Sequence, residues 1–170
     1  MSTLIPGREP VVEAWLDERR ARGLDGRDEV WEGVYHVVPH EHGRNGAVAM
    51  QLVLVLAEAA RAAGLLPGGS FNLGEPKDFR VPDLGYHRGS PDALYFPTAA
   101  LVVEVLSPDD ETFQKFDFYA RHGVEELWVV DPLERTVRMW VLRSGAYDQV
   151  DVSALLSLSC DDVAAGVDWP

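Results

Sequence analysis

Two acidic residues, Asp83 and Glu104, lie 21 positions apart in surroundings that suggest a shared chemical site. Asp83 ends the tripeptide Val-Pro-Asp, and Glu104 lies in the middle of the apolar run at residues 101–107. An unpaired buried carboxylate is costly unless it is paired, metal-bound or neutralised. A second carboxylate with a hard divalent cation between the two would compensate Glu104, because such ions prefer oxygen ligands. The pair therefore predicts a metal-dependent site that cleaves phosphodiester bonds.

A second Pro-Asp dipeptide makes Asp92 a competitor of Asp83 for the first ligand position. Asp92 is nearer to Glu104 in sequence, but residues 90–97 have the composition of a loop. Residues 80–87 have the composition of a strand that contains Asp83. We therefore favour Asp83, with a simple turn acid as its structural alternative.

The charge balance limits how the chain could bind a nucleic acid. The 170 residues carry a net charge of −13, which is the wrong sign for tight binding by general electrostatic attraction. A nuclease stays possible because acidic residues that hold cations belong to the site itself. Lys77, Arg80 and Arg88 flank Asp83 and could form a local basic strip, or could be ordinary solvated charges.

Length and composition predict one domain with a real core, since 46% of the 170 residues are hydrophobic. A single cysteine, Cys160, excludes an internal disulfide and suits a reducing compartment. The first residues do not resemble a secretion signal, and the apolar stretch at 47–63 is interrupted by Gln51 and Glu58. These features predict a cytoplasmic protein without membrane insertion.

The elements that must position the site follow from periodicity and from turn residues. Helical spacing and helix-ending glycines predict helices over residues 10–22, 45–63 and 110–122. Period-two and β-branched runs predict strands, at 29–38 (or a hairpin that turns at Gly33), 70–75, 79–87, 99–106, 126–132, 136–142 and near 147–152. Within 99–106, alternation places Glu104 on the face opposite Val103 and Val105.

The helix over 110–122 carries a lysine whose position relative to the core can be predicted. At 100° per residue, one stripe, expected to face the core, contains Phe113, Phe116 and Ala120. The opposite stripe contains Glu111, Lys115, Tyr119 and His122. Lys115 is therefore expected away from the core.

Three stretches of the chain form an ordered pattern: RVPD at 80–83, LVVEVLSP at 101–108 and KFDFYARHGVEELWVVDP at 115–132. Together they resemble the Uma-type restriction endonuclease family (domain of unknown function 820), a branch of the PD-(D/E)XK nuclease superfamily. The last stretch is long and ordered, which makes it a specific signal. The likeness extends from about Glu29 to the C-terminal strands.

The resemblance implies an α/β (α+β) restriction-endonuclease-like fold, with a central mixed β-sheet flanked by helices. It would form a single domain over 1–170, with an N-terminal helical segment at 1–26. Asp83 would be the first metal ligand, Glu104 the second and the backbone carbonyl of Val105 a possible third. The implied cofactor is Mg²⁺ or Mn²⁺, and the implied substrate is DNA.

The resemblance also implies a catalytic lysine. Many members of the superfamily carry it two residues after the glutamate, where this chain has Leu106, whereas the Uma-type position on the following helix matches Lys115. Lys115 would orient or deprotonate the attacking water or stabilise negative charge, and its structural alternative is an ion pair with Glu111. Glu29 would be an outer metal ligand or a partner of Lys115.

Other functions stay open at this point. A zinc site at His36, His40 and His42 is disfavoured, because the spacing is not His-Glu-x-x-His and no cysteine supports it, so loop or helix-cap roles are expected. A catalytically silent interaction domain of the same fold would explain the acidity. A metal-dependent hydrolase of small phosphate esters would need a narrow pocket. A homodimer is expected by analogy of fold, through the N-terminal helix or the strand at 136–142.

Overall fold

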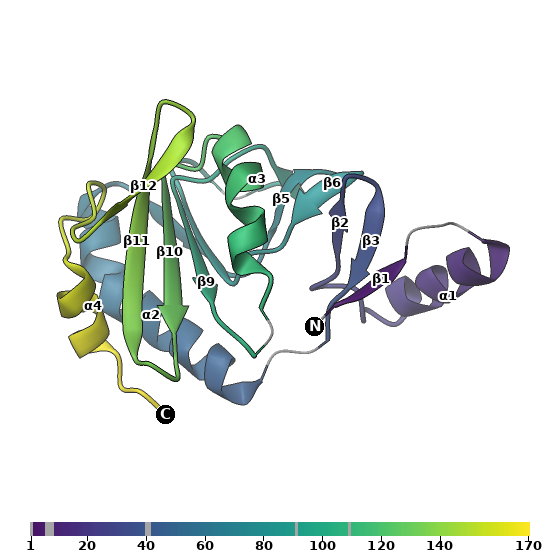
Figure 1. Ribbon diagram of the computed structural model, residues 1–170, viewed down its shortest axis with the longest axis horizontal. Coiled ribbons are helices and arrows are strands. Elements are labelled where there is room, and N and C mark those ends of the chain that lie inside the picture. The colour runs from purple at the N-terminus through teal and green to yellow at the C-terminus, as the bar shows by residue number, and fades with distance from the viewer. Residues whose placement is uncertain (1, 6–8, 40–41, 91, 109) are drawn as a thin grey trace.

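The strands form two mixed sheets that lie side by side (Figure 1). The computed structural model describes residues 2–5, 9–39, 42–90, 92–108 and 110–170. The first sheet has the order β1 (Thr3–Ile5), β3 (Val34–Val37), β2 (Glu29–Trp31), β6 (Asp78–Arg80), β5 (Asn72–Glu75) and β8 (Tyr95–Phe96). The second sheet has the order β12 (Ala146–Val150), β11 (Thr136–Arg143), β10 (Glu126–Asp131), β9 (Leu101–Val105), β7 (Leu84–His87) and β4 (Leu66–Gly68).

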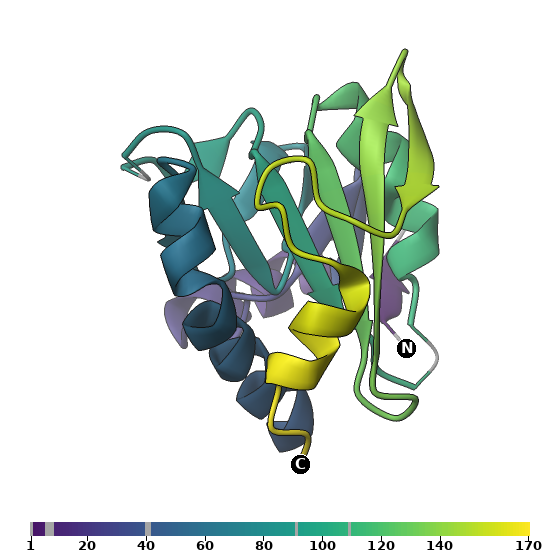
Figure 2. The same cartoon turned by 90° about the vertical axis from the view of Figure 1, so that its left-hand side faces the viewer.

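The second sheet is the central sheet that the sequence predicts, with helices on both faces. α2 (Gly43–Ala62) and α4 (Cys160–Gly166) cover one face (Figure 2). α3 (Phe116–Arg121) covers the other. The predicted alternation of β9 is confirmed, because Val103 and Val105 pack with α2 while Val102 packs with α3. β9 is buried along its whole length, and it is an interior strand because it pairs with β10 on one side and with β7 on the other.

The N-terminal helix and the first hairpin also match their predictions. α1 (Pro10–Ala21) begins with proline at its first position, where the missing N–H costs nothing. β2 and β3 form the predicted hairpin, with positive φ at Glu32 and Gly33. The segment 1–26 is not purely helical, since β1 pairs with β3. Among the described residues, no helix has both the length and the apolar character needed to cross a membrane.

The prediction of one continuous strand over 79–87 is wrong, because this segment contributes two separate strands to two different sheets. β6 ends at Arg80 in the first sheet, and β7 begins at Leu84 in the second. Pro82 has no N–H to donate to a strand ladder, so pairing stops there. Asp83 therefore lies in a bend at the crossing between the sheets, immediately before β7.

The prediction for the helix over 110–122 is correct in extent and wrong in its buried face. The segment begins as a 3₁₀ helix at Thr112–Lys115, continues as α3 and closes at Gly123, whose φ is +67°. Tyr119 is fully buried, whereas Phe113 is 49% exposed. The wheel groups Lys115 with Tyr119 correctly, but both side chains donate to Glu104 of β9, so polar contacts and not apolar content decide which stripe is buried. The stripe of Lys115 and Tyr119 faces the sheet.

A substitution at Gly74, in the β5–β6 hairpin, tests the packing between the first sheet and α3. Its φ is +119°, and a Cβ there would clash with the carbonyl oxygen of Asp78 and lie 2.9 Å from the Phe118 ring. We expect Gly74→Ala to lower the free energy of unfolding by about 2–4 kcal/mol in urea titrations. Gly43→Ala is the control, because nothing lies within 4 Å of its added Cβ. Equal stability of the two variants would contradict this packing.

Candidate functional site

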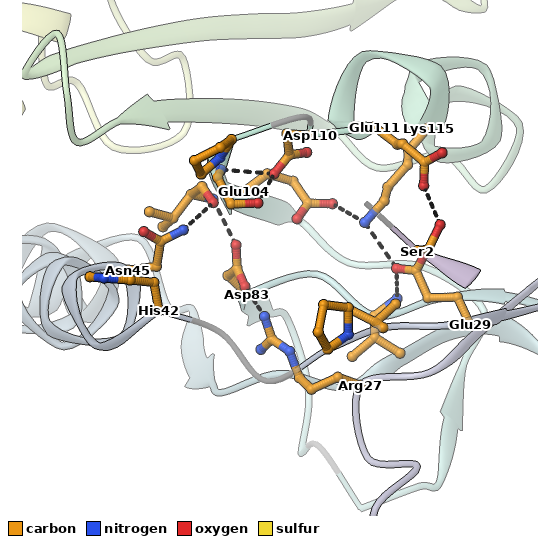
Figure 3. A pocket seen from close by; sticks show the side chains of 16 residues that line it. Ser2, Arg27, Glu29, His42, Asn45, Asp83, Glu104, Asp110, Glu111 and Lys115 are labelled. Atoms are coloured by element: carbon orange, nitrogen blue, oxygen red, sulfur yellow. Dashed lines mark hydrogen bonds and ion pairs between the residues drawn. The ribbon is translucent and has the colours of Figure 1, made fainter. Parts of the chain in front are cut away.

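An acidic pocket of about 270 Å³ lies where β9 ends and the chain crosses between the sheets (Figure 3). Its described lining includes five carboxylates against one arginine and one lysine. They are Glu29, Asp83, Glu104, Asp110 and Glu111, with Arg27 and Lys115. The structure therefore brings all four predicted side chains, Asp83, Glu104, Lys115 and Glu29, to one pocket. A phosphate group would meet an excess of negative charge there unless a further cation were bound.

Glu104 is buried in the middle of the second sheet, with 3% of its surface exposed. Its Oε1 accepts a hydrogen bond from the Tyr119 hydroxyl and another, 3.2 Å long, from Lys115 Nζ. Burial raises the pKa of Glu104 to about 7, with Lys115 opposing the rise and Asp83 adding to it. Glu104 thus keeps a proton to a higher pH than an exposed glutamate does.

Lys115 links the carboxylates of the two sheets. Its Nζ donates to Glu29 Oε1 at 2.9 Å and to Glu104 Oε1 at 3.2 Å, so its partners lie on β2 and β9. Burial disfavours the charged ammonium, but Glu104 and Glu29 outweigh it and raise the pKa of Lys115 well above its ordinary value. The lysine is therefore cationic at neutral pH. Glu111, the alternative partner, accepts from the Ser2 hydroxyl instead.

Glu29 joins the first sheet to this network. One of its oxygens, Oε1, accepts from the backbone N–H of Val81 at 2.7 Å as well as from Lys115. The other, Oε2, accepts from the Trp31 indole at 2.6 Å. Both oxygens of Glu29 are thus engaged by donors of the protein.

Asp83 is held against the end of β9 by its backbone contact. Its Oδ2 accepts from the N–H of Val105 at 2.7 Å, and its Oδ1 accepts from the guanidinium of Arg27. The bend that ends the predicted strand thereby sets Asp83 beside the residue that follows Glu104. Asp92, its competitor, is exposed and does not line the pocket.

Asn45 and Arg27 are two site residues that sequence reasoning missed. Asn45, near the start of α2, donates from Nδ2 to the carbonyls of Val105 at 3.1 Å and Leu106 at 3.0 Å. It therefore fixes the carbonyl expected as a third ligand, which keeps a second lone pair. Neither residue has a local sequence signal: the burial of Asn45, the third residue of α2, is visible only in the structure, and Arg27 pairs with Asp83 across 56 positions.

The basic strip suggested for Lys77, Arg80 and Arg88 is wrong. Arg80 is buried, donates to the carbonyl of Val30 at 2.8 Å and has its guanidinium 4.0 Å from an aromatic ring centre. Arg88 forms an ion pair with a glutamate at 2.7 Å, and Lys77 is exposed in the β5–β6 turn. None of the three lines the pocket.

The described histidines have structural contacts. His36 stacks on Trp31 with ring centres 4.3 Å apart, and burial lowers its pKa. His42 accepts from the N–H of Arg44 at 3.2 Å and so caps α2, the role expected for a histidine there. His40, the third residue of the zinc alternative, lies outside the described residues.

The donor set at the end of β9 fits a hard divalent cation in its chemistry. Asp83, Glu104 and the carbonyl of Val105 all line the pocket and all offer oxygen, which Mg²⁺ and Mn²⁺ prefer. In the described parts of the chain, no three His, Cys, Asp or Glu residues are already grouped as a metal centre. Arg27 and Lys115 instead neutralise the carboxylates, so a bound cation would compete with these two side chains.

Comparisons with known proteins identify the fold and the family. No curated protein matches the chain. A crystal structure titled as that of "a putative nuclease belonging to DUF820" from Anabaena variabilis superposes with a TM-score of 0.66 at 19% identity, covering 82% of this chain and 90% of that one. This likeness confirms the mixed α/β fold. The family model Uma2, described as "Putative restriction endonuclease", matches residues 15–169. The chain therefore belongs to the Uma2 family, as the three stretches of its sequence predict.

Proposed function

We propose that this protein is an endonuclease that hydrolyses phosphodiester bonds in DNA with the help of bound Mg²⁺ or Mn²⁺. The observation that carries the proposal is the convergence of Asp83 and Glu104 at one end of β9, in a pocket that also holds Lys115. Membership of Uma2 supports a nucleic acid as the substrate.

Asp83, Glu104 and the carbonyl of Val105 would hold the cation. When bound, the cation would supply a water of lowered pKa and neutralise charge on the phosphoryl group. The hydrogen bond from Val105 N–H fixes the Asp83 carboxylate, and that from Asn45 fixes the Val105 carbonyl. These contacts pre-position the ligand oxygens, which lowers the cost of gathering them around an ion.

Lys115 would orient the reacting groups and stabilise negative charge, rather than act as the base. Its raised pKa keeps it protonated at neutral pH, and a protonated amine cannot accept the proton of a water. Glu29 would be the partner that positions Lys115, because its two oxygens already accept from Lys115, Val81 and Trp31. That engagement favours the partner role over an outer metal ligand.

Cleavage of supercoiled plasmid tests the proposal. We expect nicking in Mg²⁺ or Mn²⁺, none in EDTA, and a loss of about a hundred-fold or more in Asp83→Ala, Glu104→Ala and Lys115→Ala. The matched control is Asp92→Ala, which removes the exposed acid of the other Pro-Asp dipeptide and should cleave like wild type. Cleavage by Asp83→Ala at the wild-type rate would contradict the proposal. So would the absence of cleavage in the wild type and in every variant.

One observation favours a catalytically silent interaction domain instead. Asp83 is paired with Arg27, and Glu29 and Glu104 share Lys115, so each of these carboxylates already has a cationic partner without a metal. A silent domain predicts no cleavage and no binding of Mn²⁺ by the wild type. The plasmid assay together with a calorimetric titration of Mn²⁺ therefore separates the two functions.

We also propose that residues 1–170 act as a single domain, that the protein works in the cytoplasm, and that it pairs as a homodimer. A dimer would present two sites, one for each strand of a duplex. Analytical sedimentation that gives a monomer at working concentrations would remove the dimer from the proposal.

A further inference from the structure

Arg27 extends into the pocket from a firmly anchored loop between α1 and β2. The neighbouring Asp28 is buried and accepts hydrogen bonds from Arg19, from the Tyr35 hydroxyl at 3.0 Å and from the N–H of Val38 at 2.9 Å. These contacts fix the backbone beside Arg27. The Arg27 side chain is 25% exposed and reaches Asp83 in the pocket (Figure 3).

Arg27 and a divalent cation would compete for the same carboxylate. The Asp83 side chain is only 10% exposed, its Oδ2 is engaged by Val105 N–H, and its Oδ1 is engaged by Arg27. Two cations that share one carboxylate oxygen repel each other strongly where little water screens them. A cation bound to Asp83 would therefore oppose the pairing of Asp83 with Arg27 and favour movement of the guanidinium away from that oxygen.

The displaced guanidinium would be well placed for a phosphate of the substrate. Lys115, the other cation of the described lining, is 12% exposed and engaged by two carboxylates, so Arg27 is the more accessible. A planar guanidinium can donate two parallel hydrogen bonds to a phosphate.

We propose that Arg27 is a further substrate-binding residue that exchanges partners. It neutralises Asp83 in the metal-free protein, and it binds a phosphate oxygen of the nucleic acid when a divalent cation takes its place on Asp83. This inference rests on the proposed nuclease function. It gives Arg27 opposite effects on the two ligands, since the side chain opposes metal binding and supports substrate binding.

Titration of the metal-free protein with Mn²⁺, followed by calorimetry without DNA, tests the first half. We expect Arg27→Met to bind Mn²⁺ about tenfold more tightly than wild type, because the competing cation is gone and the aliphatic stem is kept. Arg20→Met is the matched control, since it removes the same charge from an exposed position on α1 and should bind Mn²⁺ like wild type. Arg27→Lys should also stay close to wild type.

Steady-state cleavage of a DNA duplex at saturating Mn²⁺ tests the second half. We expect Arg27→Met to raise KM about five- to tenfold while kcat changes less, as loss of a phosphate contact predicts. If Arg27→Met binds Mn²⁺ no more tightly than wild type, or keeps the wild-type KM, the exchange is overturned although the nuclease stands. If the wild type neither binds Mn²⁺ nor cleaves, the proposed function fails and the exchange fails with it.

Discussion

Replacing Glu104 by glutamine is expected to lower metal-dependent DNA cleavage by about a thousand-fold or more, while the chain still folds. Glutamine keeps the shape and an oxygen that can accept from the Tyr119 hydroxyl, but it removes the negative charge that a divalent cation needs. The measurement is the initial rate of plasmid nicking at saturating Mg²⁺. Circular dichroism should show an unchanged fold.

A second buried carboxylate of the same sheet provides the control. Glu126 on β10 is 1% exposed, but it lies on the other face, where its oxygens accept from Trp128 at 3.0 Å, from Ser153 at 2.7 Å and from the N–H of Leu155 at 2.8 Å. Glu126→Gln should lower the free energy of unfolding by about 1–3 kcal/mol and leave cleavage unchanged. Equal losses of activity in both variants would show that burial of a charge, and not the site, controls the rate.

Lys115→Met is expected to reduce both stability and cleavage. At pH 8 the free energy of unfolding should fall by about 2–4 kcal/mol, because Glu29 and Glu104 lose their shared cation inside the protein. Cleavage should fall about a hundred-fold or more. Urea unfolding and plasmid nicking measure the two effects. The chain has only one other lysine, and Lys77→Met is the control because it removes the same charge from an exposed turn.

The loss of stability in Lys115→Met should depend on pH in a defined direction. Burial raises the pKa of Glu104 from its ordinary 4.5 to about 7, so its carboxyl favours the folded state most below pH 4.5, and this contribution is lost as the pH rises through 7. The positive charge of Lys115 lowers the pKa of Glu104, so this pKa should rise further in the variant. The variant should therefore lose less stability at pH 6 than at pH 8. An equal or larger loss at pH 6 would contradict the pairing.

Glu104 and Glu126 show how far sequence reasoning reaches. The apolar run around Glu104 predicts a buried carboxylate that needs a partner, and the structure supplies Lys115 and Tyr119. Glu126 begins a similar apolar run, yet its partners come from the segment at 153–155. Local sequence thus predicts that a charge is buried, but which groups compensate it depends on contacts between distant segments.

The positions that sequence reasoning placed wrongly share a tertiary cause. The buried face of the helix that carries Lys115 depends on contacts with Glu29 and Glu104 of distant strands, which periodicity does not reveal. The bend at Asp83 depends on which sheet each neighbouring strand joins. Arg27 reaches Asp83 across 56 positions. Helices and strands with clear periodicity, such as α2 and β9, were predictable because their own side chains determine them.

Anomalous diffraction from crystals soaked in Mn²⁺ tests most directly whether this pocket holds the catalytic cation. We predict one strong peak within about 2–2.5 Å of oxygens from both Asp83 and Glu104, with the guanidinium of Arg27 moved away from Asp83. The same soak of Glu104→Gln should show no peak there. A wild-type pocket without a peak, with Arg27 still paired to Asp83, would contradict the metal-dependent site.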